Sequence, residues 1–348
     1  MHRSGSAPTV AGLAAVVLVA LTCVACASSR TTSPTQDTPT SSSSTLSSST
    51  TTSTATSRAS ATTADTTALP GAGKPAITVG DKNYAEQFVL GQLYAQALRA
   101  QGYSVNVNQN IGPTDVTVQA LQNGSLTVYP EYLNTFNTAV ARYRHGFGTL
   151  LDAYDGAQHY ALGHGMQVLA PTPFSDTPAI AVTVAYAAQN HVRGIGDLDR
   201  VTGDVTLGGP PQFQQGTPGL PALNVIYGFV PIGYRPMAVG DQYPALNSGT
   251  IQAAEVNSTD AQLASGDYVV LRDPRRVFGW GNVVPVVSDK AAAAEGPAFA
   301  DTIQRVDDTL TTATIRQLNY AVSIAGQDPA SAARQYLQTH GLLAPVAS

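Results

Sequence analysis

Residues 76–107 read AITVGDKNYAEQFVLGQLYAQALRAQGYSVNV, and this stretch decides the fold class. Its first four residues form a short run rich in β-branched side chains, which ends at Gly80. Apolar residues at helical spacing follow over 85–100, and Gly102 closes that segment. Residues 103–107 alternate between apolar and polar side chains, as a strand does. The pattern therefore predicts a strand, a helix and a second strand.

The same alternation continues toward the C-terminus. The stretch Gly112-Pro113-Thr114-Asp115 predicts a helix that Thr114 caps and that ends at Asn123-Gly124. Residues 126–129 read as a third strand. This β-α-β-α-β order predicts right-handed crossovers and a mainly parallel sheet. A second set of strands and helices is expected over 179–283, and helices are expected over 298–310, 312–319 and 329–340.

Size and composition point to a two-lobed protein without disulfides. Residues 74–343 are too many for one small core and suit two lobes. The only two cysteines, Cys23 and Cys26, lie near the N-terminus, so the folded part must rest on its hydrophobic core. No basic patch suggests nucleic-acid binding, and no long apolar segment after the leader suggests a membrane span.

The N-terminal segment predicts export and a lipid anchor. Residues 10–21 form an apolar run of the length expected for a signal peptide. Val24-Ala25-Cys26 resembles the end of a bacterial lipobox, which makes Cys26 the predicted lipid acceptor. Cys23 is the weaker candidate because Leu21 and Thr22 make a poorer small-residue cleavage site. An ordinary secretory leader with two incidental cysteines is the alternative.

The leader and the segment after it define the expected location of the protein. We expect residues 1–26 to be a lipoprotein signal peptide and residues 27–73 a disordered tether rich in Ser and Thr. The tether could also carry glycans. The protein is therefore expected on the outer face of the cytoplasmic membrane, tethered by lipid.

Four stretches, in this order, carry a family resemblance: GDKNYAEQ at 80–87, VQAL with VYPEY at 118–132, PGLP with VIYGF at 218–229, and RQLNY at 316–320. Together they resemble the osmoprotectant-binding proteins of ABC importers. That family captures glycine betaine, choline, carnitine and related quaternary amines. The resemblance covers residues 76–343.

The resemblance implies an α/β fold of the type II periplasmic-binding-protein class. Two lobes would be joined by two crossover segments, with the ligand in the cleft between them. Lobe I would combine residues 76–177 with 284–343, and lobe II would be residues 178–283. In open α/β sheets, ligands also bind outside the carboxyl ends of strands. The implied partners are a small-molecule ligand and the ABC permease and ATPase subunits; we expect a monomer, with no cofactor or metal.

The resemblance also implies the roles of individual residues. A quaternary ammonium cannot donate a hydrogen bond, so aromatic faces recognise it through cation–π attraction. Tyr132 and Trp280 fall on positions of the aromatic cage, and Asp176 falls near the cationic headgroup. Lys82 and Thr135 fall on residues that contact a ligand carboxylate.

Other cage positions depart from the family pattern. A third tyrosine is replaced by Pro178 or Thr177, and a fourth is replaced by Asn257. The arginine that assists the carboxylate falls on Gly216. We therefore expect weak betaine binding, or a more polar ligand that forms a hydrogen bond with Asn257.

Three other functions are alternatives to this interpretation. The sequence shows no nucleophile paired with a base, and His159 and His164 stand five residues apart, which is wrong for a helical zinc pair, so no enzyme is expected. The protein could instead bind another small polar solute such as an amino acid, with Lys82 and Asp176 holding its two charges. It could also be a ligand sensor that is not coupled to import.

Overall fold

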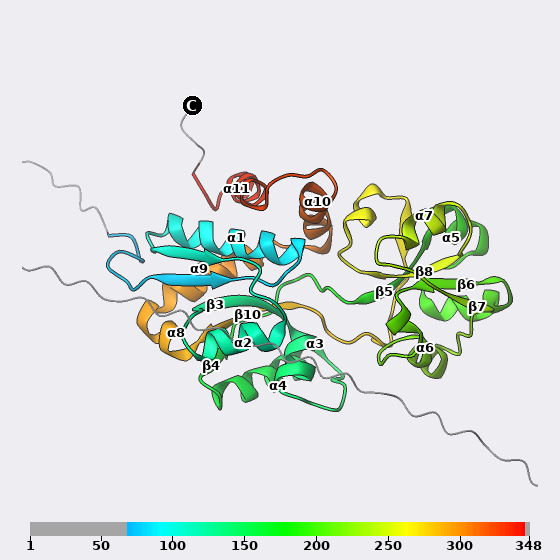
Figure 1. Cartoon of the computed structure of the whole chain (residues 1–348), viewed down its shortest axis with the longest axis horizontal. Coiled ribbons are helices and arrows are strands. Elements are labelled where there is room, and N and C mark those ends of the chain that lie inside the picture. Colours follow the sequence, from blue (N-terminus) through cyan, green and yellow to red (C-terminus); the bar gives the residue numbers. More distant parts are fainter. Residues whose placement is uncertain (1–67, 345–348) are drawn as a thin grey trace, which may run out of the picture. The chain divides into compact units, whose positions relative to one another are not determined.

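A computed structural model describes residues 68–344 of the chain, apart from the side chain of Thr202 (Figure 1). The predicted signal peptide, Cys26 and most of the predicted tether lie outside the described residues. No helix within 68–344 combines the length and the apolar character needed to cross a membrane.

The strands of the described part form two five-stranded sheets. The first sheet has the order β2-β1-β3-β10-β4 and the second has the order β7-β6-β8-β5-β9. The strands are β1 (Ile77–Gly80), β2 (Val105–Asn108), β3 (Val128–Tyr132), β4 (Met166–Val168), β5 (Pro178–Thr183), β6 (Thr206–Gly209), β7 (Gly233–Pro236), β8 (Ala253–Asn257), β9 (Tyr268–Val270) and β10 (Val283–Ser288).

Helices cover both sheets. The α-helices are α1 (Ala85–Ala100), α2 (Thr114–Gln122), α3 (Leu133–Thr135), α4 (Leu150–Leu162), α5 (Val184–Asn190), α6 (Leu220–Tyr227), α7 (Gln242–Asn247), α8 (Asp289–Glu295), α9 (Pro297–Asp307), α10 (Thr312–Ser323) and α11 (Pro329–Thr339). Short helices of other types are η1 (Phe136–Val140), η2 (Ile195–Asp204), η3 (Pro211–Gln214) and η4 (Ala261–Ser265).

The first sheet is buried on both faces because its strands alternate between two cores. In β3, Val128 packs with α1, α9, α10 and α11, whereas the next residue, Tyr129, packs with α4 on the opposite face. In β10, Val283 and Val284 divide in the same way. Period-2 alternation thus places apolar side chains on each face of the sheet.

The second sheet follows the same rule. In β5, Ile180 and Val182 belong to one core, and the alternate residues Ala179 and Ala181 belong to the other. Both sheets therefore have helices or loops on each face, as expected for an α/β fold.

Two details of the sequence-based prediction are wrong. The first sheet is mixed rather than mainly parallel: β1 pairs parallel with β2 and β3, but β10 pairs antiparallel with β3 and β4. The reason is that β10 enters the sheet from the second sheet and not through a β-α-β crossover. Thr114 is the first residue of α2 and not its cap, which is Pro113. The Thr114 hydroxyl instead accepts a hydrogen bond from Lys82 Nζ at 2.9 Å.

Two connecting segments run between the sheets, one after β4 and one before β10, and they lie side by side. Ser175 and Asn282 form an isolated antiparallel bridge. The Asp176 N–H donates to the Gly281 carbonyl at 2.9 Å, and the Gly281 N–H donates to Ser175 Oγ at 3.1 Å. A Cβ atom on Gly281 would lie 1.8 Å from the Asp176 carbonyl oxygen, so this contact requires glycine.

Candidate functional site

A cavity of about 630 Å³ has walls from both sheets and the segments joining them. The N-terminus of α1 and the segment after β3 supply one side. The start of β5 and the segment after β8 supply the other, and α10 adds two residues. The lining residues are Tyr84, Ala85, Glu86, Tyr132, Asn134, Thr135, Asp176, Thr177, Pro178, Val239, Gly240, Asn257, Thr259, Asp260, Ala261, Gln262, Asn319 and Ser323. Several of them follow the carboxyl ends of β1, β3 and β8, where open α/β sheets bind ligands.

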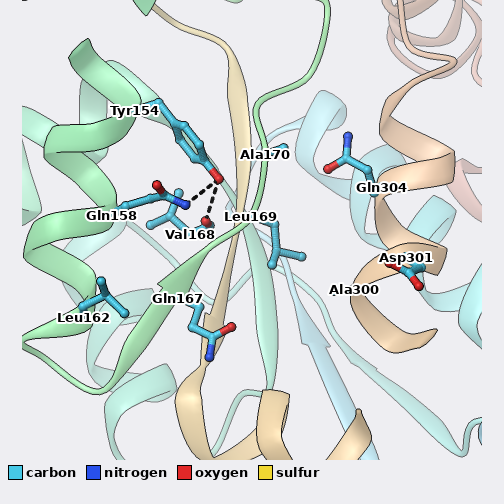
Figure 2. A pocket seen from close by; sticks show the side chains of 10 residues that line it. All are labelled: Tyr154, Gln158, Leu162, Gln167, Val168, Leu169, Ala170, Ala300, Asp301 and Gln304. Carbon is cyan, nitrogen blue, oxygen red and sulfur yellow. Dashed lines mark hydrogen bonds between the residues drawn. The ribbon is translucent and has the colours of Figure 1, made fainter. Parts of the chain in front are cut away.

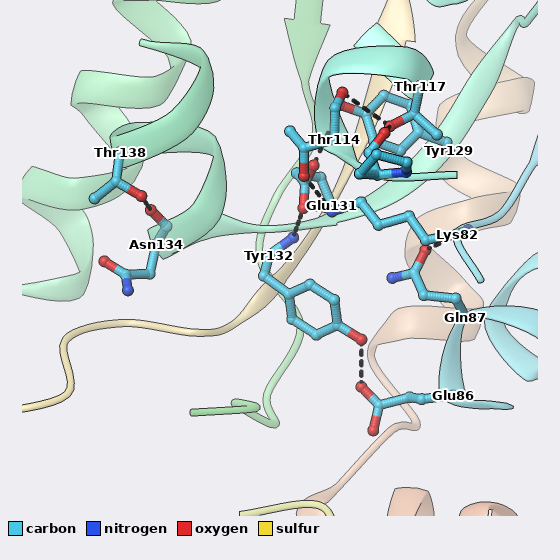
Figure 3. Close-up of polar contacts among 11 residues, drawn as sticks. Lys82, Glu86, Gln87, Thr114, Thr117, Tyr129, Glu131, Tyr132, Asn134 and Thr138 are labelled. Carbon is cyan, nitrogen blue, oxygen red and sulfur yellow. Dashed lines mark hydrogen bonds and ion pairs between the residues drawn. The ribbon is translucent and has the colours of Figure 1, made fainter. Parts of the chain in front are cut away.

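Two tyrosines and a glutamate form the centre of the first wall. The rings of Tyr84 and Tyr132 are stacked, with centroids 6.0 Å apart and planes inclined by 22°. The Tyr132 hydroxyl donates to Glu86 Oε1 at 2.7 Å (Figure 3). Asn319 Nδ2 donates to the other oxygen of Glu86 at 2.8 Å. The pair of rings and the carboxylate can together receive an organic cation.

Four of the six predicted ligand-binding residues line this cavity: Tyr132, Thr135, Asp176 and Asn257. The cage departures Thr177 and Pro178 line it as well, whereas Gly216 does not. Burial raises the pKa of the Asp176 carboxyl well above its ordinary range, and the nearby charge of Glu86 raises it further. The Asp176 Oδ1 atom is buried without a hydrogen-bond partner.

Lys82 does not line the cavity. Its ammonium group is buried, forms an ion pair with Glu131 and donates to Thr114 Oγ1 (Figure 3). Glu131 in turn accepts a hydrogen bond from the backbone N–H of Tyr132 at 2.7 Å. The charge of Lys82 is therefore balanced inside the protein, behind the ring of Tyr132, whose centroid is 5.7 Å from Nζ.

Trp280 also lies outside the lining of the cavity. Its indole Nε1 donates to the Phe147 carbonyl at 3.1 Å, and its ring packs against the core that α4 covers. The guanidinium of Arg276 occupies one ring face, 4.4 Å from the centroid. Neighbouring Gly281 lies against Asp176 and Thr177 of the other connecting segment, so its lack of a side chain serves the contact between the two segments.

Three residues at the centre of the first wall and beside it are not among the residues predicted from the sequence: Tyr84, Glu86 and Asn319. Tyr84 and Glu86 belong to the GDKNYAEQ stretch, and their position just after β1 at the start of α1 was the available signal. Asn319 belongs to the RQLNY stretch. Its contact with Glu86, 233 residues earlier in the chain, has no local sequence signal.

A smaller hollow of about 390 Å³ lies between α4, β4 and α9 (Figure 2). Its lining includes Tyr154, Gln158 and Asp301 but no predicted site residue. The Tyr154 hydroxyl already donates to the Val168 carbonyl and accepts from Gln158 Nε2. Tyr154 and Gln158 thus join α4 to β4, and the cavity walled by both sheets, which contains four predicted site residues, is the better candidate site.

The fold has two mixed β-sheets covered by helices, two paired connecting segments, and a cavity walled by both sheets. This arrangement defines a type II periplasmic binding protein. A solved structure described as a glycine betaine/carnitine/choline ABC transporter matches this fold with a TM-score of 0.73 and 22% sequence identity. The match covers 76% of this chain and 99% of that chain.

Sequence comparison identifies the family. Residues 75–339 match the OpuAC family, the substrate binding domain of the ABC-type glycine betaine transport system, and the chain belongs to this family. It is 29% identical to a glycine-betaine-binding protein of Pseudomonas aeruginosa, over 77% of this chain and 88% of that protein. It is 28% identical to the glycine betaine-binding protein YehZ of Escherichia coli, over 79% and 93%. The family resemblance expected from the sequence is confirmed.

Members of this family are extracytoplasmic substrate-binding proteins of ABC importers, which pair with permease and ATPase subunits. Their role is transport and not catalysis.

Proposed function

We propose that this protein captures a quaternary amine of the glycine betaine or choline type outside the cytoplasm and delivers it to an ABC permease. The observation that carries the proposal is the pair of stacked rings of Tyr84 and Tyr132 beside the Glu86 carboxylate. Aromatic faces and a nearby carboxylate attract a cation that cannot donate hydrogen bonds. Membership of the family supports the same function.

The proposed ligand contacts come from both walls of the cavity. Tyr132 and Tyr84 would face the ammonium group, and Asp176 would balance its charge. Thr135 and Asn257 would form hydrogen bonds with the polar end of the ligand. Lys82 would act indirectly, because its ion pair with Glu131 holds the backbone of Tyr132 in place.

We also propose that the chain is divided into two lobes. Lobe I would comprise residues 76–177 and 283–343, and lobe II residues 178–282, so that ligand binding closes the lobes around two connecting segments. The second boundary differs by one residue from the 178–283 expected from the sequence, because Val283 begins β10 of the first sheet. We further propose a monomer that is anchored by a lipid on Cys26 through the tether over 27–73.

A calorimetric and thermal-shift screen of the purified full chain tests this function. The panel contains glycine betaine, choline, carnitine, proline betaine and the common amino acids. A ligand present at a hundred times its dissociation constant should stabilise the fold by about 2.7 kcal/mol. Binding of at least one quaternary amine supports the proposal. Binding of amino acids alone would favour the polar-solute alternative, and silence from the whole panel would overturn the quaternary-amine function.

A further inference from the structure

The charges around the cavity are of one sign. Its described lining contains three carboxylates, Glu86, Asp176 and Asp260, and it contains no Lys, Arg or His side chain. A zwitterion such as a betaine needs a cation or strong donors for its own carboxylate. The lining offers such a group only hydroxyls, amides and backbone.

The basic side chains nearest these acids already have partners. Lys82 forms its ion pair with Glu131. Arg316 of α10 donates to the Ser258 carbonyl at 2.8 Å, and its charge acts on Asp260, which also accepts hydrogen bonds from the Tyr243 hydroxyl and the Asn257 N–H. The negative charge of Asp260 is thus stabilised by a nearby guanidinium and by two hydrogen bonds.

Within the described residues, Glu86 and Asp176 form no ion pair with a basic side chain. Glu86 accepts hydrogen bonds from the neutral groups of Tyr132 and Asn319, and Asp176 Oδ1 is buried without a donor. Burial raises the pKa of both carboxyls, and the charge of Glu86 raises that of Asp176 further. A cation bound beside these two carboxyls favours their ionised forms and is attracted by them.

The pair does not form a metal site with its neighbours. Among residues 68–344, no group of three or more His, Cys, Asp or Glu side chains is placed to hold a metal ion. The tyrosine rings beside Glu86 instead suit an organic cation, because their faces carry negative potential.

We propose that Glu86 and Asp176 make this cavity selective for an organic monocation that carries a hydroxyl, of the choline type, over a zwitterion such as glycine betaine. This inference rests on the proposed capture of quaternary amines and adds the charge of the ligand. The ammonium group binds between the tyrosines and the two acids. Thr135 and Asn257 can form hydrogen bonds with a neutral hydroxyl of the ligand. A ligand carboxylate at the same place would be repelled by the negative charges of Glu86 and Asp176, which no basic side chain of the lining balances.

Choline and glycine betaine form a matched pair for the test, because they share the trimethylammonium group and differ in hydroxymethyl against carboxylate. Titration calorimetry on the full chain at pH 7.5 should give choline at least tenfold tighter binding. Asp176→Asn should weaken choline at least tenfold and weaken glycine betaine less, so that the preference for choline falls. Asp301→Asn, which removes an exposed charge outside the cavity, should change neither.

The outcomes separate the two proposals. Equal or tighter binding of glycine betaine overturns the charge selectivity and leaves the capture of quaternary amines intact. Binding of neither ligand by folded protein overturns both. If Asp176→Asn and Asp301→Asn change the two ligand affinities equally, Asp176 has no role in the charge selectivity. Should Asp176→Asn fail to fold, Glu86→Gln provides the same comparison of the two ligands.

Discussion

Tyr84 is the residue at which ligand contact can be tested with little effect on folding. Its ring lines the cavity and stacks on Tyr132, yet the residue is 39% exposed. One cation–π face contributes about 0.5–2 kcal/mol to binding. Tyr84→Ala should therefore weaken binding of a quaternary amine about 2- to 30-fold in calorimetry. The melting temperature without ligand should change little.

Tyr320 supplies the control for Tyr84. It is 40% exposed and does not line the cavity. Tyr320→Ala should leave the affinity unchanged. Equal loss of affinity in both variants would show that the Tyr84 ring makes no specific contact with the ligand.

Asp81 makes the stability of the fold depend on pH. The residue is fully buried, and Oδ1 accepts the Asn110 N–H at 2.6 Å while Oδ2 has no partner. Burial raises the pKa of this carboxyl from 3.8 to about 7. Between these values the unfolded chain releases the proton and the folded chain keeps it. Stability therefore falls as pH rises from about 4 to 7, by at most about 4 kcal/mol.

Asp81→Asn should remove this part of the pH dependence. Urea unfolding at pH 4.5, 6 and 8 should show the variant gaining stability relative to the wild-type protein as pH increases. The stability of the variant should still depend on pH to some extent, because Asp307 and Glu255 are also buried carboxyls with raised pKa values. Parallel curves for the two proteins would contradict the assignment to Asp81.

Single residues also show how far the sequence could predict the site. Tyr132 and Asp176 were predicted from the family resemblance, and both line the cavity. Lys82 was predicted in the same way, but its orientation depends on Glu131, an acid 49 residues away that the fold brings into contact. Nor does the sequence around Trp280 reveal that its indole N–H donates to the Phe147 carbonyl or that the Arg276 guanidinium lies over its ring. Contacts between distant segments decide these cases.

At the scale of elements, regular periodicity was a reliable guide. The predicted helix over 85–100 coincides with α1, and the helices expected over 312–319 and 329–340 appear as α10 and α11. Strand direction was not predictable from the order of elements, because β10 joins the first sheet after the chain has built the second. Local pattern defines an element, whereas the path of the chain between elements defines its partners.

The helix α10 connects the first core to the segment after β8. Asn319 Nδ2 donates both to Glu86 Oε2 and to the Thr259 carbonyl, at 2.8 and 2.9 Å. Asn319→Ala leaves a buried carboxylate oxygen without a donor, so it should destabilise the protein by about 1–3 kcal/mol in urea unfolding. Gln317→Ala, an exposed change on the same helix, should stay within about 0.5 kcal/mol. Similar costs for both would show that the two bonds contribute nothing.

The paired connecting segments depend on Gly281. A methyl group there would meet the Asp176 carbonyl and the Thr177 side chain, so the two backbones must separate. Gly281→Ala should destabilise the fold by about 1–3 kcal/mol and weaken ligand binding through Asp176. Gly146→Ala is the control, because nothing lies within 4 Å of its Cβ position. An unchanged melting temperature in Gly281→Ala would show that the segments separate without cost.

At the scale of the whole molecule, capture and anchoring are assigned to different parts of the chain. The cavity is built by residues 84–323, whereas the proposed lipid acceptor Cys26 lies outside the described residues. Removing the anchor should therefore change where the protein resides and leave its affinity for ligand intact. This separation makes the location of the protein testable independently of its ligand.

Cys26→Ser should release the protein from membranes, because a serine at this position cannot carry the thioether-linked lipid. The matched control is Cys23→Ser, which should stay in the membrane fraction after a high-salt wash. Immunoblots of washed membranes and supernatant measure both, and calorimetry on the released protein should give unchanged ligand affinity. Release by Cys23→Ser, with Cys26→Ser retained, would make Cys23 the acceptor. Retention of the double variant Cys23→Ser/Cys26→Ser would overturn the lipid anchor, since that variant lacks both cysteines of the chain.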